Sequence, residues 1–313
     1  MPSLTLLDIA KMNGSDDIVP LIEENMSVAP EFNGAGRTIA GTSYNSLVRD
    51  TLPGVGFRNA NEGVAGVKSI WSQRLTSTFI VNARIEMDKA VADSSEDGPD
   101  AVIAREASGV IKSMMLSLGS QMYYGVATTV ATSAAASPTK GFPGLVSTYD
   151  STNLAVDAGG AGSDTSSVWG VKWGPDALQW VVGRNGMFDL SALTTERVLD
   201  GSDLPYTAYV RELLTYVGLQ QVNKHAVGRI RNIDTGSGLS DDDIAELLSL
   251  FPVGMTPDAL YMNRRSLRLL RSSRTATISS GGTDRTVALP FPDSSMGIPI
   301  IVTDSIKDTE TSA

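Results

Sequence analysis

The sequence contains no cysteine and a single histidine, and these two absences exclude several kinds of site. Without cysteine the chain forms no disulfide, no thiolate zinc site, no iron–sulfur cluster and no cysteine nucleophile. Serine catalysis with an imidazole base would have to recruit His225, and a zinc site built from several histidines is impossible. No carboxylate stands beside His225 in the sequence, so a surface or hydrogen-bonded histidine is a simpler interpretation than a catalytic base.

Basic residues are also scarce. The chain has 25 Lys and Arg against 35 Asp and Glu, a formal charge of −10. Proteins dedicated to nucleic-acid binding usually carry a basic face, so this balance argues against that class. Among the basic residues, 17 are Arg and 8 are Lys. Either use in protein interfaces, where Arg is enriched and Lys depleted, or the codon bias of a GC-rich genome explains this excess.

Long apolar runs are missing as well. The longest charge-free stretch, 113–139, is diluted by Ser, Thr, Gln and Gly and ends in Ser137-Pro138, so it does not predict a transmembrane helix. The first residues lack the basic and apolar regions of a signal peptide, and we expect a soluble intracellular protein. With 42% hydrophobic residues, the 313-residue chain can bury the core of two domains or of one elaborated domain.

Phosphate-binding and hydrolytic motifs are absent too. No Gly-Lys-Ser/Thr sequence of a phosphate loop occurs, and Gly54-Val55-Gly56 lacks the third glycine of a dinucleotide fingerprint. There is no His-Glu-x-x-His motif and no nucleophile elbow. A hydrolase that uses two carboxylates stays open as a hypothesis, although no candidate pair stands out in the sequence.

Residues 1–40 are predicted to form an arm rather than a domain. Two short amphipathic helices, around 4–10 and 16–22, precede a Gly-rich break at 33–36. Helices this short need a surface to lie on, which another subunit could supply.

Residues 41–86 have β character and predict a long two-stranded excursion. Its segment 75–85 alternates, with Leu75, Phe79, Val81 and Ile85 on one face. A lone hairpin is marginally stable in water, so we expect this apolar face to dock on a neighbouring subunit.

The strongest helix prediction covers 98–125, where Pro99 suits the first helical position. Its apolar positions recur at spacings of three and four: Ile103, Ala107, Val110, Ile111, Met114, Leu118 and Met122. A connecting loop over 134–145 follows. Beyond it the patterns predict strands at 168–173, 178–182, 227–233 and 298–302, helices at 206–217, from 240 and at 260–274, and a polar tail at 307–313.

Two charged clusters allow more than one interpretation. Asp241-Asp242-Asp243 suggests a metal site, but Ser240 as N-cap with carboxylates at a helix N-terminus is a simpler explanation. In the helix at 260–274, Arg264, Arg268 and Arg271 share one face. A solvated face, a phosphate-binding stripe and a subunit interface all remain open for these arginines.

Six stretches together resemble the major capsid proteins of tailed bacteriophages, in a podovirus-like subgroup, over about residues 4–306. They are DTLPGVGFRNANEGV at 50–64, MYYG at 122–125, FPGL at 142–145, SVWGVKWGP at 167–175, LYMNRRSL at 260–267 and GIPIIVTD at 297–304. Their order and spacing carry the resemblance.

This resemblance implies the α+β shell fold of tailed phages and herpesviruses, sometimes called the Johnson fold. It would consist of an N-terminal arm (1–40), an extended β-hairpin loop (41–86), a peripheral domain (87–150) with a spine helix at 98–125, an axial domain (151–290) and a return strand with a C-terminal tail (291–313). Residues 151–235 are either an elaborated axial domain or an insertion.

The implied function is that of a coat protein that assembles into the icosahedral shell around the genome of a tailed bacteriophage. The implied location is the capsid shell of the virion, which assembles in the cytoplasm of the bacterial host. The implied partners are other copies in hexameric and pentameric capsomers, with scaffolding, portal and decoration proteins, and DNA enclosed without sequence-specific binding. No catalysis, cofactor, metal or membrane is implied. The candidate inter-subunit contacts are Pro53, Phe57, Arg58, Leu75, Phe79, Val81, Ile85, Arg264, Arg268 and Arg271. The alternatives are another virion protein, such as a decoration or tail-tube subunit, and the carboxylate-based hydrolase.

Overall fold

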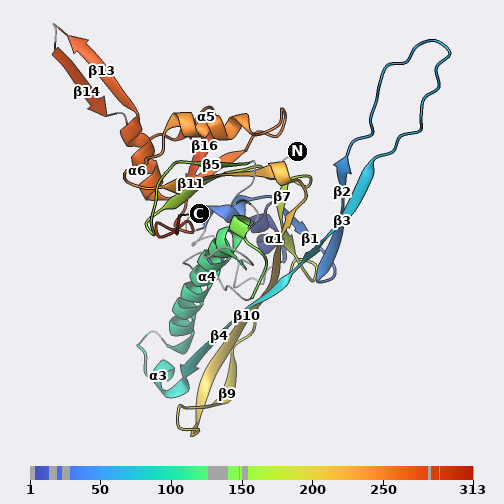
Figure 1. Ribbon diagram of the computed structural model, residues 1–313. Coiled ribbons are helices and arrows are strands. Elements are labelled where there is room, and N and C mark those ends of the chain that lie inside the picture. The colour runs from blue at the N-terminus through green and yellow to red at the C-terminus, as the bar shows by residue number, and fades with distance from the viewer. Residues whose placement is uncertain are drawn as a thin grey trace.

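A computed structural model describes residues 4–13, 20–22, 29–96, 98–125, 140–147, 149, 154–280, 283–288 and 290–312. These residues form two six-stranded sheets and two separate two-stranded ribbons, with a long helix, α4 (Pro99–Tyr124), beside the first sheet. Figure 1 shows one sheet extending down along α4, the other above it, and the two ribbons projecting from opposite sides. Within the described residues no helix is both long and apolar enough to cross a membrane.

The first sheet is organised around one long strand, β10 (Pro205–Gln221). It pairs antiparallel with β4 (Phe79–Asp88) along one edge, and with β7 (Leu178–Val182), β8 (Phe188–Leu190) and β9 (Thr194–Leu199) along the other. The short strand β1 (Gly36–Thr38) adds to β7 in parallel.

The helix predicted at 206–217 is wrong, because this segment is the middle of β10. Its apolar residues at spacings of three and four also satisfy a strand, and Leu213, Thr215 and Val217 are buried alternately. The segment is rich in Tyr, Val and Thr, which favour a pleated surface. Pairing with four other strands then decides in favour of the strand.

The second sheet runs in the order β15 (Ser294–Ser295), β16 (Ile298–Val302), β12 (Ala259–Met262), β6 (Ser166–Val171), β11 (Val227–Ile233) and β5 (Ala155–Asp157). Alternate residues of β6 serve two cores: Trp169 and Val171 join the core that contains α4, whereas Val168 faces the opposite side. On that side α5 (Asp241–Ser249) and α6 (Arg264–Ser273) cover the sheet with Leu247, Leu270 and their neighbours.

The predicted strands at 168–173, 178–182, 227–233 and 298–302 are confirmed within one or two residues at each end, and so is the helix after Ser240. The helix predicted at 260–274 begins later than expected, because residues 259–262 form β12. Asn263 ends the strand and caps the helix, since its side chain accepts a hydrogen bond from the Ser266 amide at 2.7 Å.

The spine helix is confirmed at Pro99–Tyr124, with Gly98 as N-cap and all seven predicted apolar residues buried or packed against the core. A short helix, α3 (Lys89–Asp93), joins it to β4. The loop predicted at 134–145 lies partly outside the described residues. Its last part is followed by η3 (Leu145–Ser147), whose Leu145 joins the same core.

The described part of the N-terminal segment does not project from the subunit as an arm. Helix α1 (Leu6–Asn13) places Leu6 and Ile9 in this chain's own core, and the turn η2 (Pro30–Asn33) adds Phe32. Helix α1 is short, as predicted, but it packs on β1 and β7 of the same chain. Of the helix predicted at 16–22, only residues 20–22 lie within the described part.

The sheet topology also divides the chain differently from the boundary expected at residue 151. Residues 178–221 belong to the sheet of β4, whereas 155–171 and 227–233 belong to the sheet of β16. The chain therefore crosses between the sheets after β6 and returns after β10, through the turn η4 (Lys224–Ala226).

Two ribbons project from this body (Figure 1). The first pairs β2 (Ser43–Thr51) with β3 (Ile70–Ser77), so a two-stranded excursion is present, but it ends at Ser77 because residues 79–88 form β4 of the first sheet. The second pairs β13 (Thr275–Ser280) with β14 (Thr283–Ala288), after α6. Neither ribbon has a second layer of its own among the described residues, so each depends on other contacts for stability.

Candidate assembly surfaces

The first projecting ribbon, with the 52–69 connection at its end, is largely exposed. We call residues 43–77 the arm. In its connection Phe57 and Val55 are fully or almost fully exposed, at 111% and 92% of their reference areas. A turn organises this tip, because the Glu62 carboxylate accepts the Asn59 amide at 2.9 Å and the Glu62 carbonyl accepts the Arg58 guanidinium at 2.9 Å.

The ribbon itself presents an apolar face. In the register of β2 and β3, Asn45 lies opposite Leu75 and Arg49 opposite Trp71, which places Leu47, Trp71 and Leu75 on the same side. All three are exposed, and the Arg49 guanidinium lies 4.5 Å from the centre of the Trp71 ring. Exposed apolar side chains gathered on one surface typically mark a contact with another protein.

The structure separates the four residues that were predicted to share one docking face. Leu75 is 65% exposed on the arm, but Phe79 and Val81 pack against the main core and Ile85 is buried in it. Thr78 lies between β3 and β4, and its amide donates to the Thr42 carbonyl at 2.8 Å, so the chain changes sheet at this point. The expectation of a common outward face is therefore wrong, since β4 pairs with β10 of its own chain.

The predicted contacts in the tip lie where a neighbour could reach them. Phe57 and Arg58 are exposed, and Pro53 is half-buried at the beginning of the connection. Leu47 and Trp71 were not predicted. A partial signal was available, because two segments that contain large apolar residues flank a Gly-rich loop.

The arginines of α6 form a second exposed surface. Arg264 is 81% exposed and lies 3.6 Å from the Asp304 carboxylate, and Arg268 is exposed one turn later. Arg271 is half-buried, with its guanidinium 4.7 Å from the Phe291 ring centre. We call these three residues the basic stripe.

The acidic residues of α5 are partly explained by helix capping. Ser240 accepts a hydrogen bond from the Asp243 amide, and the Asp243 carboxylate accepts one from the Ser240 amide at 2.8 Å, a reciprocal capping box. Asp241 forms two hydrogen bonds with the Arg274 guanidinium, which holds the pKa of this carboxyl below its usual range. Asp242 and Glu246 are exposed and take no part in either arrangement.

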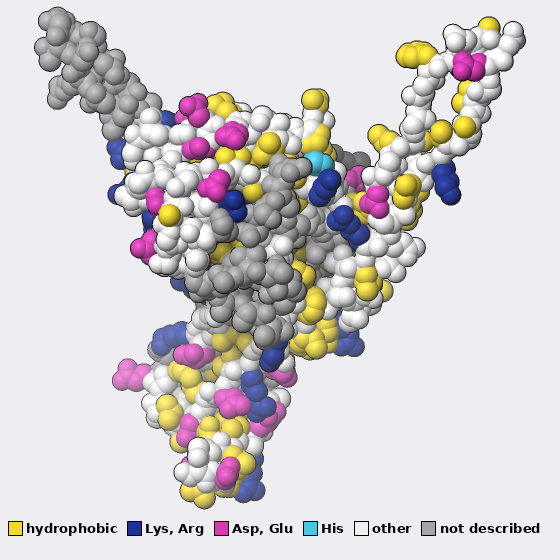
Figure 2. Space-filling view, viewed as in Figure 1, with side chains coloured by type: hydrophobic (Ala, Val, Ile, Leu, Met, Phe, Trp, Pro, Cys, Tyr) yellow, Lys and Arg dark blue, Asp and Glu magenta, His cyan; other side chains and the backbone are white. Residues whose placement is uncertain are grey.

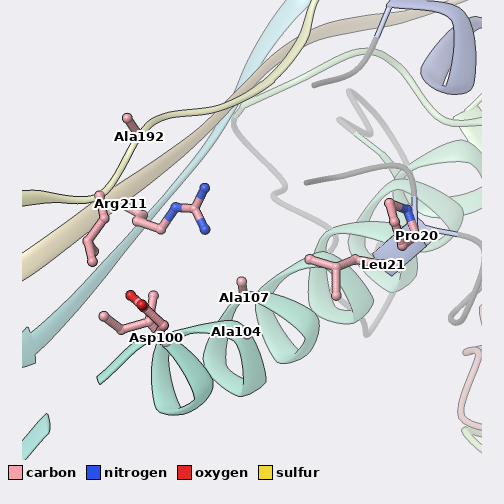
Figure 3. Close-up of a pocket in the computed structure, with 9 residues that line it drawn as sticks. Pro20, Leu21, Asp100, Ala104, Ala107, Ala192 and Arg211 are labelled. Atoms are coloured by element: carbon pink, nitrogen blue, oxygen red, sulfur yellow. The ribbon is translucent and has the colours of Figure 1, made fainter. Parts of the chain in front are cut away.

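A groove of about 580 Å³ lies between the N-terminal half of α4 and the start of β9 (Figure 3). Asp100, Ala104 and Ala107 of α4 form one wall in this view, with Ala192 and Arg211 across from them. Pro20, Leu21, Ile103 and Leu193 complete its lining. The lining is chiefly apolar and holds one carboxylate, so it does not provide the pair of carboxylates that a glycosidase-type hydrolase needs.

Within the described residues, two carboxylates, those of Glu31 and Glu310, are deeply buried and take part in the core. Glu310 accepts hydrogen bonds from Tyr124 and Ser167 and lies 3.0 Å from the Arg229 guanidinium. Glu31 accepts hydrogen bonds from Thr303 at 2.6 Å and Tyr123 at 3.2 Å. Burial raises the pKa of the Glu31 carboxyl, although these hydrogen bonds oppose the shift.

The predicted polar tail at 307–313 therefore includes a buried residue that belongs to the core. Residue 310 is 4% exposed and bridges to Thr165 through two backbone hydrogen bonds. His225, in η4, is half-buried, and its amide donates to the Asn223 side chain.

The architecture resembles those of solved phage structures. A chain from the structure of bacteriophage Epsilon15 matches with a TM-score of 0.61 and 21% identity, over 89% of this chain and 88% of that one. A chain from the capsid of the Myoviridae phage XM1 matches with a TM-score of 0.44 and 11% identity, over 68% and 92%. No curated protein sequence matches this chain.

Two sheets, a spine helix and an exposed arm define a subunit of the tailed-phage shell fold, as the sequence resemblance implied. Residues 35–313 match the family model described as Major capsid protein GP7, and the chain belongs to that family. It is a shell-forming coat protein of a tailed phage and is located in the capsid shell of the virion. Membership of this family implies a structural role.

Proposed function

We propose that the arm binds a neighbouring subunit and thereby joins copies of this chain into hexameric and pentameric capsomers. The observation that carries the proposal is the exposed apolar surface of the arm, from Leu47, Trp71 and Leu75 in the ribbon to Val55 and Phe57 in the tip. A two-stranded ribbon is marginal in water, and burying one such side chain contributes about 1.5–3 kcal/mol. Contact with a neighbour would supply this burial.

The basic stripe and Pro53 and Arg58 of the tip are further contacts in this proposal. The role is assembly without catalysis. The resemblance to capsid proteins also suggests portal, scaffolding and decoration proteins as partners. A net charge of −10 supports a wall that encloses DNA without holding it to a sequence.

The test replaces residues 53–68 with a short Gly-Ser linker. Because these residues pack on nothing else in the described chain, we expect the variant to keep the melting temperature and circular dichroism of the unassembled wild-type protein. Shell formation, followed by light scattering and negative-stain microscopy, should be lost.

Normal shells from the linker variant would overturn the proposed role of the arm.

A further inference from the structure

The two helices that cover the second sheet carry opposite charges on their exposed sides. On α6 the basic stripe occupies positions i, i+4 and i+7 (Arg264, Arg268 and Arg271). On α5, Asp242 and Glu246 occupy positions i and i+4 and are both exposed; we call them the acidic stripe. Residues four apart on a helix lie about 5–6 Å apart, so the two stripes have matching spacing.

Arg264 and Arg268 do not pair with the acidic stripe within one chain. The helices meet through Arg274, whose guanidinium donates to the Asp241 carboxylate at the beginning of α5. Among the described residues, neither Arg264 nor Arg268 forms an ion pair or hydrogen bond with Asp242 or Glu246. Figure 2 shows the acidic side chains gathered over α5 and the basic ones along the margin where α6 lies.

Arg264 is only weakly engaged by its own chain. Its nearest carboxylate, Asp304, lies at 3.6 Å, and both side chains are mostly exposed. Exposed pairs of this kind contribute little, and the long Arg side chain remains able to turn to another partner. Arg268 extends the same exposed face by one turn.

We propose that the basic stripe on α6 binds the acidic stripe on α5 of a second copy of this chain, with Arg264 and Arg268 paired to Asp242 and Glu246. The proposal rests on the proposed assembly function and names the partner of these arginines. A contact between two different surfaces of identical subunits is heterologous, and such contacts close into rings when the rotation is suitable. Each subunit would give its basic stripe to one neighbour and its acidic stripe to the next.

Charge complementarity favours this partner over DNA. Both members of the contact are present on the same chain at the same spacing, and the excess of ten negative charges disfavours association of the chain with DNA. In a shell, a second copy is also always adjacent. A phosphate backbone would engage the arginines but would leave the acidic stripe without a role.

The experiment is a charge-exchange cycle on the full chain. Arg268→Glu and Glu246→Arg should each raise the protein concentration needed for half-maximal assembly about fivefold, because each places like charges across the contact. The double variant R268E/E246R should return to within about twofold of wild type, since it restores opposite charges. Arg197→Glu, which reverses an exposed charge on β9, is the matched control and should assemble as wild type.

The readouts are light scattering for assembly, microscopy for shells and a thermal melt for folding. A double variant as impaired as the single ones overturns the pairing, while wild-type shells still form and the proposed function stands. Unchanged assembly of Arg268→Glu also overturns the pairing. If this variant binds less DNA than the wild type, the arginines contact phosphate; if its DNA binding is unchanged too, they form a solvated face. If the wild-type chain forms no assembly under any salt condition, the proposed function itself fails.

Discussion

Replacing Glu310 with Ala tests whether the C-terminal segment secures the two halves of the subunit. The Glu310 carboxylate receives hydrogen bonds from Tyr124 at the end of α4 and Ser167 in β6, and it pairs with Arg229 in β11 at 3.0 Å. Glu310 and Arg229 are 4% and 3% exposed. One side chain therefore joins the spine helix to the second sheet.

The expected cost follows from this burial. Glu310→Ala leaves the Arg229 guanidinium as a buried charge without its carboxylate, which typically costs about 3–5 kcal/mol. Total stabilities are about 5–15 kcal/mol, so this variant loses a large share of its free energy of unfolding. Asp304→Ala is the matched control, because its partner Arg264 is largely exposed and such pairs contribute about 0–1 kcal/mol.

The assay is urea denaturation of the unassembled chain, followed by tryptophan fluorescence. Four variants are compared: Glu310→Ala, Arg229→Met, the double variant and Asp304→Ala. The double variant should recover much of the loss, because it leaves no unpaired charge inside. A loss below 1 kcal/mol for Glu310→Ala, equal to that of Asp304→Ala, would refute the argument.

Two further predictions concern folding. Phe79→Asp should lower the free energy of unfolding by about 2–3 kcal/mol, because Phe79 packs on the core. Phe57→Asp, on the exposed tip, should change this free energy by no more than about 0.5 kcal/mol and should weaken assembly instead. Equal stability of the two variants in urea denaturation would contradict this prediction. Glu31→Gln addresses pH: burial raises the pKa of Glu31 above its usual 4.5, so the folded state binds this proton more tightly. The contribution of this proton to stability is complete below pH 4.5 and is lost as the pH rises through the raised pKa of Glu31. The free energy of unfolding, measured across this range, should therefore fall more steeply with pH in the wild type than in Glu31→Gln. Identical slopes would count against a buried, titrating Glu31.

Local periodicity was sufficient to predict several elements. The spine helix follows from apolar residues at spacings of three and four over seven turns, and the cap of α5 follows from Ser240 before a run of carboxylates. These features are determined by residues close together in the chain. The exposed tip was also predictable, since no helix or strand pattern includes Phe57 and Arg58.

Features that depend on distant pairing could not be predicted in the same way. Residues 206–217 fit a helix by spacing, and pairing with β4, 120 to 138 positions earlier, together with β7, β8 and β9, makes them a strand. The polar composition of 307–313 hides Glu310, because its partner Arg229 lies 81 positions away. A signal did exist: Arg229 is a charged residue among the apolar positions of strand 227–233, which predicts a buried partner of opposite charge.

The distribution of large apolar residues separates the part of the chain that folds by itself from the part that needs a neighbour. Aromatic residues make up only 6% of the sequence, and Trp169, Trp180 and Phe32 are fully buried in the core. Phe57 and Trp71 are nevertheless placed on the arm, where Phe57 is fully exposed and Trp71 is half exposed. In a shell each such side chain would be buried once per subunit, so a contribution of about 1.5–3 kcal/mol from a single residue is repeated at every arm. A subunit with marginal pairwise contacts can in this way remain soluble alone and still form a stable shell, because the shell requires all of these contacts together.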